Sequence, residues 1–244
     1  MHDATIAEKW QNPVVTWRSG HYPNGRPAAT IDVMHAQLVL FDGFDPLDIV
    51  APFEVLAAGA QTAGADLVVE FVSAEGPRPV VGGTLGFTLH ATSTLDPTRP
   101  GFVVVPGASG PLEGDPDDGV ETIPVLLARF AQSQAAPLLR QALANPNVVV
   151  ATVCGGSLAL AMAGLIEGRN AVTHHMGVDV LDATGVTAVR ARVVDDGDLV
   201  TAGGVTSGLD LALYLLERTF GPQVALYVED LFAYERRGTV WRAA

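Results

Sequence analysis

The stretch from Val148 to Leu165, VVVATVCGGSLALAMAGL, constrains the fold of this chain more than any other. The apolar run that ends at Val153 predicts a strand buried on both faces. The Ala-, Leu- and Met-rich run from Leu158 predicts a helix. Between them the chain must turn sharply, at Cys154-Gly155-Gly156-Ser157. Strand, tight turn and helix in this order predict a nucleophile elbow, with sulfur in place of a serine oxygen.

Cys154 is the single cysteine among the 244 residues. The free N–H groups and the dipole at a helix N-terminus favour negative charge. We therefore expect the pKa of this thiol to fall and the thiolate to be available for attack. The alternative is a small buried hydrophobe, which is the usual role of a free cysteine. The two glycines after Cys154 favour the nucleophile, because a core cysteine needs no tight turn.

Apolar strand-like segments alternate with helical segments along most of the chain, which predicts a mostly parallel sheet covered by helices on both faces. Pro52 is compatible only with the first turn of its helix, and Pro137 is expected to divide a pair of helices. The predicted strands are 36–41, 67–73, 102–105, 148–153 and 171–174, with a hairpin or an excursion from the sheet at 78–90 and a hairpin at 188–201. The predicted helices are 47–59, 121–144, 158–165, 176–183, 207–220 and 223–232.

The domain organisation predicted from the sequence is simple. Residues 1–33 are polar, contain several Gly and Pro residues and lack sustained periodicity, so they are expected to form an N-terminal extension. Residues 34–244 contain no linker or internal repeat that would divide them. We therefore expect a single domain over residues 34–244.

The composition excludes several classes of function. The chain carries 14 Lys and Arg against 27 Asp and Glu, a net charge of −13, so it is not expected to bind nucleic acid. No apolar run is long enough for a membrane span, and the N-terminus lacks the apolar core of a secretory signal. One cysteine allows no internal disulfide, and the histidines lack metal-binding spacing. We therefore expect a cytoplasmic protein, and we predict no metal site.

An acid is needed near Cys154 to move protons, and Asp48 is the best candidate. Three turns, at 42–48, 106–110 and 154–157, follow predicted strands, and ligands of parallel sheets bind beyond the carboxyl ends of the strands. Asp42 and Asp45 lie in the same loop and are weaker candidates. If Asp48 lies near Cys154 in an apolar pocket, its pKa should rise. The alternative is a first-turn acid that complements the helix dipole.

Backbone donors and one histidine complete the candidate site. The N–H of Gly155 is expected to face an anion that forms on the substrate, with a second donor at Gly107 or Ala108. The alternative for these last two residues is an ordinary tight turn after a strand. His174 follows the strand after the elbow helix and could line the pocket as the partner of a nucleophilic cysteine. Its alternative is a histidine with ordinary structural hydrogen bonds.

Four segments together resemble the ThiJ/PfpI family of the class I glutamine amidotransferase-like superfamily. They are LVLFDGFDPLDIVAPFEVL, VVVPGASG, ATVCGGSLALAMAGLIEGRNAVTHH and LVTAGGVTSGLDLALYLLERTFG. The pair Leu47-Asp48 before a helix proline, and the run from Thr201 to Asp210, look closest to the isocyanide (isonitrile) hydratase branch. The amidotransferase-like domains of some transcription regulators are similar.

This resemblance implies a flavodoxin-like three-layer α/β/α sandwich, a homodimer and no cofactor. It implies that Cys154 attacks an isocyanide carbon to give a thioimidate. Asp48 would relay protons while water adds and an N-substituted formamide leaves. Cys154 and Asp48 would then be the catalytic residues of a lyase that acts on a small electrophile.

Two positions depart from the hydratase pattern, and two other functions stay open. Gly155 stands where that branch has threonine, and Ala108 stands where its Pro-Gly-Gly turn has glycine. Glyoxalase and deglycase members usually carry glutamate in place of Asp48, but His174 matches one of their histidines, which keeps a carbonyl-directed enzyme as one alternative. The other is a non-catalytic ligand-binding or redox-sensing protein, in which Cys154 is oxidised to a sulfinate.

Overall fold

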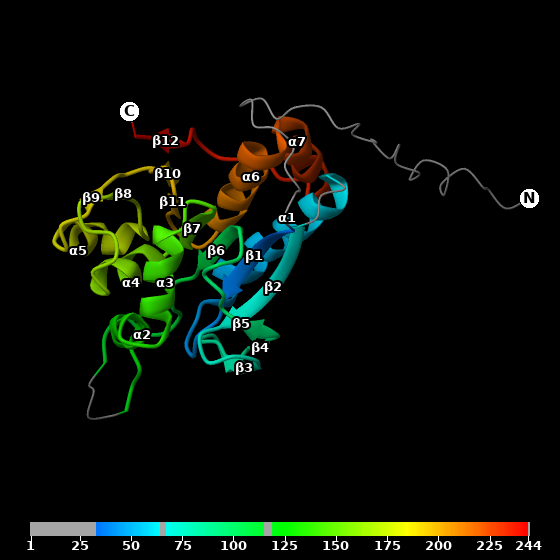
Figure 1. Cartoon of the computed structure of the whole chain (residues 1–244). Helices are drawn as coiled ribbons and strands as arrows, with labels where there is room; N and C mark the ends of the chain where they lie inside the picture. The colour runs from blue at the N-terminus through cyan, green and yellow to red at the C-terminus, as the bar shows by residue number, and fades with distance from the viewer. Residues whose placement is uncertain (1–32, 64–66, 115–118, 244) are drawn as a thin grey trace, which may run out of the picture. The chain divides into compact units, whose positions relative to one another are not determined.

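The computed structural model describes residues 33–63, 67–114 and 119–243, which build an eight-stranded sheet between helices (Figure 1). Every neighbouring pair of strands is parallel except β10 and β11. In spatial order the strands are β12 (Trp241–Arg242), β10 (Val193–Asp195), β11 (Leu199–Ala202), β7 (Val148–Val153), β6 (Gly101–Val105), β1 (Met34–Val39), β2 (Leu67–Ser73) and β5 (Ser93–Thr94).

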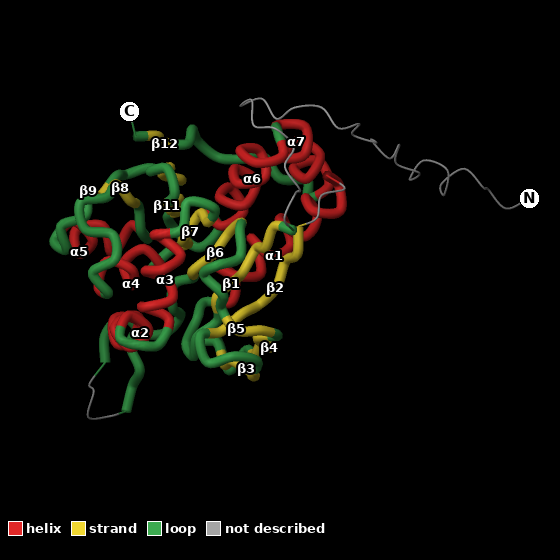
Figure 2. The backbone as a smooth tube through the Cα atoms, in the orientation of Figure 1, coloured by secondary structure: helices red, strands yellow, loops and turns green. Residues whose placement is uncertain are grey.

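Two groups of helices cover the sheet (Figure 2). The first group consists of α1 (Pro46–Ala63), α6 (Ser207–Phe220) and α7 (Pro222–Leu231), which pack against one another. The second consists of α2 (Ile123–Ala131), α3 (Ala135–Ala144), α4 (Gly156–Met162) and, beside α4, α5 (Val178–Asp182). The predicted three-layer α/β/α fold with a mostly parallel sheet is confirmed. None of the described helices has the length and apolar character needed to cross a membrane.

Smaller elements extend this framework. The predicted hairpin lies outside the main sheet and consists of β3 (Arg78–Val81) and β4 (Thr88–Ala91). Two short parallel strands, β8 (Asn170–Ala171) and β9 (Thr187–Ala188), and a 3-10 turn at His175–Gly177 lie around α5. The predicted strand 171–174 is therefore much shorter, because the chain turns at His174 into this 3-10 segment.

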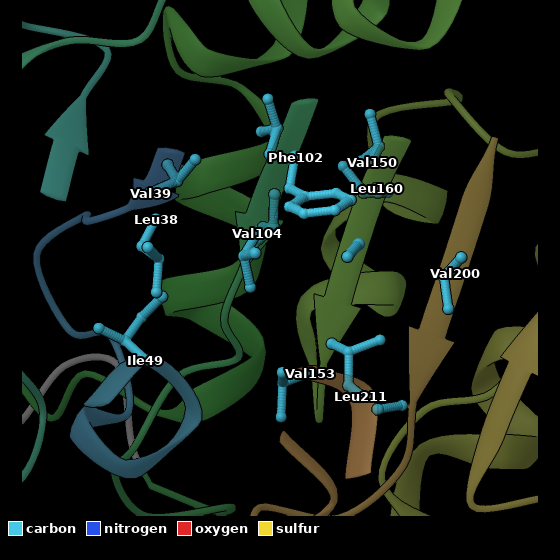
Figure 3. Packing of buried hydrophobic residues seen from close by; sticks show 14 of the residues in the cluster. Leu38, Val39, Ile49, Phe102, Val104, Val150, Val153, Leu160, Val200 and Leu211 are labelled. Carbon is cyan, nitrogen blue, oxygen red and sulfur yellow. The ribbon is translucent and has the colours of Figure 1, made fainter. Parts of the chain in front are cut away.

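The central strands are buried on both faces, as their apolar runs predict. Every residue of β6 is buried, and so are all residues of β7 except Val149. Phe102, Val104 and Val150 pack with residues of the flanking helices, including Ile49 of α1, Leu160 of α4 and Leu211 of α6 (Figure 3). A strand covered by helices on both faces needs no alternation of apolar and polar residues, which explains the valine runs in the sequence.

Both expectations about proline are wrong. Helix α1 begins at Pro46, since Asp45 Oδ1 accepts the N–H of Leu47 at 2.9 Å, and Pro52 therefore lies inside the helix rather than in its first turn. Because proline has no N–H, Pro52 cannot bond the carbonyl of the residue four positions earlier, which is Asp48. Helices α2 and α3 separate at residues 132–134, and Pro137 falls in the first turn of α3, where it is tolerated.

The predicted N-terminal extension, residues 1–33, lies outside the described residues except for Val33. The predicted domain over residues 34–244 contains all the elements above. Because β1, β6, β7 and β11 are parallel, their carboxyl ends meet at one edge of the sheet. The turns that follow β6, β7 and β11 carry Gly107, Cys154 and Gly203, and the turn after β1 leads into α1, whose third residue is Asp48.

Candidate active site

Cys154 lies at a sharp elbow between β7 and α4. Its φ is +55°, a left-handed conformation that residues other than glycine rarely adopt. Its N–H donates to the carbonyl of Gly203 at 2.8 Å and to that of Ala202 at 3.1 Å. Its own carbonyl accepts the hydroxyl of Thr173 at 2.8 Å. Hydrogen bonds on both sides thus hold a strained residue in place, as at other functional turns.

Gly156 lets the elbow helix approach the neighbouring strand closely. A Cβ at this position would lie 2.3 Å from the carbonyl oxygen of Val105 and 3.0 Å from that of Pro106. Any side chain would therefore push α4 away from the end of β6. The glycine after the turn is needed for helix–strand packing, as the nucleophile elbow predicts.

Asp48 is fully buried at the third position of α1. Its Oδ2 accepts the backbone N–H of Gly107 at 2.8 Å, while its Oδ1 is buried without an aligned hydrogen-bond partner. A Cβ at Gly107 would lie 3.0 Å from Asp48 Oδ2 and 2.6 Å from the nitrogen of Gly155. The acid, the turn after β6 and the elbow therefore meet at one point.

Asp48 and Cys154 lie close enough for each group to shift the pKa of the other. Burial and the nearby charge of Asp45 raise the pKa of Asp48 to about 8, although the Gly107 N–H and the Cys154 thiol both favour the carboxylate. The predicted rise in this pKa is thus confirmed. At neutral pH the carboxyl is mainly protonated and uncharged, in a position to donate a proton.

The expectation that the pKa of Cys154 falls is wrong. Burial and the charge of Asp48 raise it, and the hydrogen bond from the N–H of Gly155 does not offset them. Helix α4 has only seven residues, so its N-terminus adds little to that single N–H. The thiol and the carboxyl lose their protons as a coupled pair, and in the resting protein both are mainly protonated. A reaction at this sulfur therefore needs a proton transfer within the pair.

The backbone donors are used differently from one another. The N–H of Gly107 is occupied by Asp48 and does not face a substrate, whereas the N–H of Gly155 reaches the sulfur. Ala108 is buried and pairs with Phe44 as an isolated bridge. The loop after β1 and the turn after β6 are joined around Asp48 by this bridge. They are also joined by a hydrogen bond from the Asp45 N–H to the Gly107 carbonyl at 3.0 Å.

His174 lies at the same edge of the sheet, beside the turn that follows β11. A Cβ at Gly204 would lie 3.5 Å from its ring carbon Cδ2. Its Nδ1 accepts the N–H of Met176, and burial together with the neighbouring His175 lowers its pKa, so the ring is neutral at pH 7. Within the described residues no hydrogen bond links His174 to Cys154 or Asp48. Its predicted role in lining a pocket stays a prediction.

Sequence reasoning missed Leu127, which lies against the elbow from α2. A Cβ at Gly155 would lie 3.0 Å from Cδ1 of Leu127 and 3.4 Å from its Cδ2. The leucine is buried and fills the place of a side chain at position 155. No local signal could reveal this contact, because α2 is separated from the elbow by another helix and a strand.

Cys154 is largely shielded from solvent. Cys154 keeps 8% of its surface exposed, which suits a small substrate better than a peptide. Two cavities, of about 690 Å³ and 260 Å³, lie away from this edge. The first is lined by residues including Asp195 and Tyr214, and the second lies between α1 and α7. Among the described residues, no group of three or more His, Cys, Asp or Glu side chains could hold a metal ion.

Similarity to known proteins places this site in a family. The model of the DJ-1/PfpI family matches residues 128–218, which include the elbow. The isonitrile hydratase of Pseudomonas putida is 34% identical over 199 residues, covering 80% of this chain and 76% of that protein. The chain belongs to the DJ-1/PfpI family. The predicted resemblance to ThiJ/PfpI proteins, and to their isonitrile hydratase branch in particular, is confirmed.

Other DJ-1/PfpI relatives carry different names. The regulator CdhR of Pseudomonas aeruginosa is 27% identical over 81% of this chain, and protein DJ-1 homolog A of Arabidopsis thaliana is 29% identical over 78%. The chain spans 54% and 44% of the lengths of these two proteins. Among solved structures, a ThiJ/PfpI family protein from Pseudomonas syringae has a TM-score of 0.68 at 20% identity, covering 92% of this chain and 84% of that one. This structural match shows that the chain has the ThiJ/PfpI fold.

We predict that Gly155→Thr destabilises the protein through Leu127. The new side chain would overpack this contact and cost about 1–3 kcal/mol. Leu127→Ala alone should cost about 2–5 kcal/mol through the cavity it leaves. The double variant should lose clearly less than the sum of the two, because each change relieves the other. Urea unfolding of the four proteins measures this coupling, and strictly additive costs would show that the two side chains do not compete for space.

We predict that Asp48 makes stability fall as pH rises from about 4 to 8. Its pKa is about 8 in the folded protein against 3.8 ordinarily, so the folded state binds the extra proton in this window. The loss is at most about 1.4 kcal/mol per pH unit. In Asp48→Asn this contribution should vanish, whereas Asp179→Asn, at an exposed carboxyl, should keep the wild-type slope. Equal slopes in urea unfolding of wild type and Asp48→Asn would contradict the raised pKa.

Proposed function

We propose that this protein is a cysteine-dependent hydratase of the isonitrile type, which converts an isocyanide to an N-substituted formamide. The observation that carries this proposal is the pairing of a buried, mainly protonated carboxyl, Asp48, with the thiol of Cys154. An isocyanide carbon must receive both a proton and a nucleophile, and the pair supplies both. Similarity to the isonitrile hydratase of Pseudomonas putida over most of the chain supports the same reaction.

In the first step the carboxyl of Asp48 protonates the terminal carbon of the isocyanide, which makes that carbon electrophilic. The sulfur of Cys154 then forms a bond to it, and the thiol proton passes to the Asp48 carboxylate. The product is a thioimidate, R–N=CH–S–Cys154, and Asp48 is protonated again. This order explains why a thiol with a raised pKa can react, since its proton leaves only as the carboxylate forms beside it.

In the second step water adds to the thioimidate carbon. Asp48 donates a proton to the nitrogen and accepts one from the water, which gives R–NH–CH(OH)–S–Cys154. Cleavage of the C–S bond then releases R–NH–CHO, and the hydroxyl proton returns to the sulfur. The N–H of Gly155, which reaches the sulfur, stabilises the leaving thiolate. We propose that Ala108 and His174 contact the substrate from the neighbouring turns.

We also propose that the protein acts in the cytoplasm as a homodimer. The hairpin β3–β4 packs on the loops around the site, since the N–H of Gly83 donates to the carbonyl of Phe44 at 2.9 Å. The tip of this hairpin exposes two large apolar side chains, Leu85 and Phe87. Apolar side chains gathered on a surface mark protein contacts, and a second copy of the chain is the occupant that the family resemblance implies.

Light scattering of the purified protein tests this association. We expect twice the chain mass of 25.4 kDa, and a shift toward the monomer in the double variant Leu85→Asp/Phe87→Asp. Leu226→Asp, at an exposed position on α7, is the matched control and should remain dimeric. A monomeric wild type, or a hairpin variant that stays dimeric, would contradict the proposal.

The proposed reaction is tested by following formamide formation from cyclohexyl isocyanide. We expect Cys154→Ala to abolish turnover and Asp48→Asn to reduce it by about 10²–10⁴-fold, the usual contribution of a general acid. In wild type kcat/KM should fall above about pH 8, where Asp48 loses its proton. Asp45→Asn removes a charge that raises the pKa of Asp48, so this decline should move to lower pH.

Three results would count against the hydratase. Equal turnover by wild type and Cys154→Ala would remove the nucleophile from the mechanism. Cysteine-dependent conversion of methylglyoxal to lactate, with isocyanide untouched, would favour a glyoxalase. Selective oxidation of Cys154 by dilute peroxide, with neither substrate turned over, would favour a redox sensor.

A further inference from the structure

The run Thr201–Asp210, TAGGVTSGLD, carries part of the family resemblance but takes no part in the mechanism above. Its first residues complete β11, and its last residues begin α6. Between these elements the chain turns at residues 203–206, beside the elbow. The hydrogen bonds of this turn indicate what the run does for Cys154.

Two consecutive backbone hydrogen bonds connect the elbow to the start of β10. The N–H of Cys154 donates to the carbonyl of Gly203 at 2.8 Å, and the N–H of Gly203 donates to the carbonyl of Arg192 at 3.0 Å. Cys154 has a strained φ of +55°, which persists only while its surroundings hold it. The position of Arg192 therefore bears on the conformation of the nucleophile.

The side chain of Arg192 forms a largely buried ionic cluster with Asp210 in the first turn of α6. Asp210 keeps 3% of its surface exposed, and its carboxylate accepts Arg192 Nε at 2.6 Å, the Tyr234 hydroxyl at 2.9 Å and the Arg237 N–H at 2.7 Å. A second nitrogen of Arg192 donates to the Thr206 hydroxyl at 3.2 Å. Charge-assisted bonds of this kind have narrow geometry, so they fix both ends of the turn 203–206.

We propose that Arg192 and Asp210 are positioning residues for Cys154. Their ion pair holds the turn 203–206, the carbonyl of Gly203 fixes the N–H of Cys154, and the sulfur is thereby kept buried against Asp48 and the N–H of Gly155. The inference rests on the proposed role of Cys154 as the reacting group, but it concerns the thiol itself and not the identity of the substrate.

The same cluster also holds the C-terminal segment through Tyr234 and Arg237. A purely structural role would make it an anchor for this segment, with no effect on the thiol of the folded protein. The two roles differ in one observable, which is the reactivity of Cys154 as a function of pH. The charged groups that act on the thiol are Asp48 and Asp45, and neither belongs to the cluster.

The test is the rate of alkylation of Cys154 by iodoacetamide between pH 6 and 10, followed by intact mass, in wild type, Asp210→Asn and Arg192→Lys. In the variants we expect alkylation to be several-fold faster and the apparent pKa of the thiol to move down toward its ordinary value of about 8.5, because the sulfur leaves its buried position. With isocyanide as substrate, kcat should fall by roughly 10- to 100-fold while KM changes little, since small misplacements of a reacting group have effects of this size.

Asp196→Asn is the matched control. Asp196 accepts Arg169 Nε at 2.5 Å and Asn170 Nδ2 at 2.8 Å, in a similar ionic cluster at the opposite end of the β10–β11 hairpin. Its loss should lower the unfolding midpoint and leave the alkylation profile unchanged. Thr206→Val removes only the exposed hydrogen bond from Arg192. It should move the alkylation profile in the same direction as Asp210→Asn, but by a smaller amount. This variant keeps the test valid if Asp210→Asn does not fold.

An unchanged alkylation profile in the folded variants would overturn the proposal, and so would an equal shift in Asp196→Asn. Failure of wild type to hydrate isocyanides would overturn the proposed function but leave the alkylation test intact. A shifted profile without such turnover would therefore support the positioning role at a site with another substrate.

Discussion

The buried carboxyl of Asp48, held at one oxygen by the N–H of Gly107, is the interaction on which the arrangement of the site depends. It can form only if the loop after β1 and the turn after β6 lie against each other. They do so through the bond from the Asp45 N–H to the Gly107 carbonyl and through that from the Ser109 N–H to the Gly43 carbonyl, each 3.0 Å long. Burial in turn keeps the carboxyl protonated, because a lone negative charge is costly away from water.

In this arrangement the elbow places the sulfur of Cys154 but does not activate it. The elbow presents the sulfur at the edge of the sheet, but burial raises the pKa of the thiol. In the proposed hydratase reaction, activation comes from proton exchange with Asp48 and not from a thiolate stored in the resting protein. A neutral pair of this kind fits the proposed isocyanide substrate, whose carbon is itself activated by protonation.

Much of the fold could be predicted from the sequence, because local patterns determine it. The valine runs of β6 and β7, the glycines of the elbow and the periodicity of α6 each carry their own signal, and the predicted limits of α6 match those observed. Predictions that depended on competing local signals were less accurate. Pro52 lies inside a helix because the side chain of Asp45 caps that helix at Pro46, six residues before Pro52. Helix α2 ends before Ser133, whose hydroxyl accepts the N–H of Ala135.

The candidate site was predictable in its members but not in its electrostatics. The sequence pointed to Cys154 and Asp48 at one edge of the sheet. The sign of the pKa shift of Cys154 depends on how deeply both groups are buried and on their contact, which a linear sequence does not show. Leu127 against Gly155, and the use of the Gly107 N–H by Asp48, are likewise tertiary contacts.

The most direct test of this account is the titration of the Asp48 carboxyl itself. Isotope-edited infrared or carbon NMR spectra of aspartate-labelled wild type, with the Asp48→Asn spectrum subtracted, isolate the signal of this one group. The account predicts a protonated carboxyl at pH 7 that ionises near pH 8, and an earlier ionisation when the charge of Asp45 is removed. A carboxyl already ionised at about pH 5, close to the ordinary range of aspartate, would contradict it.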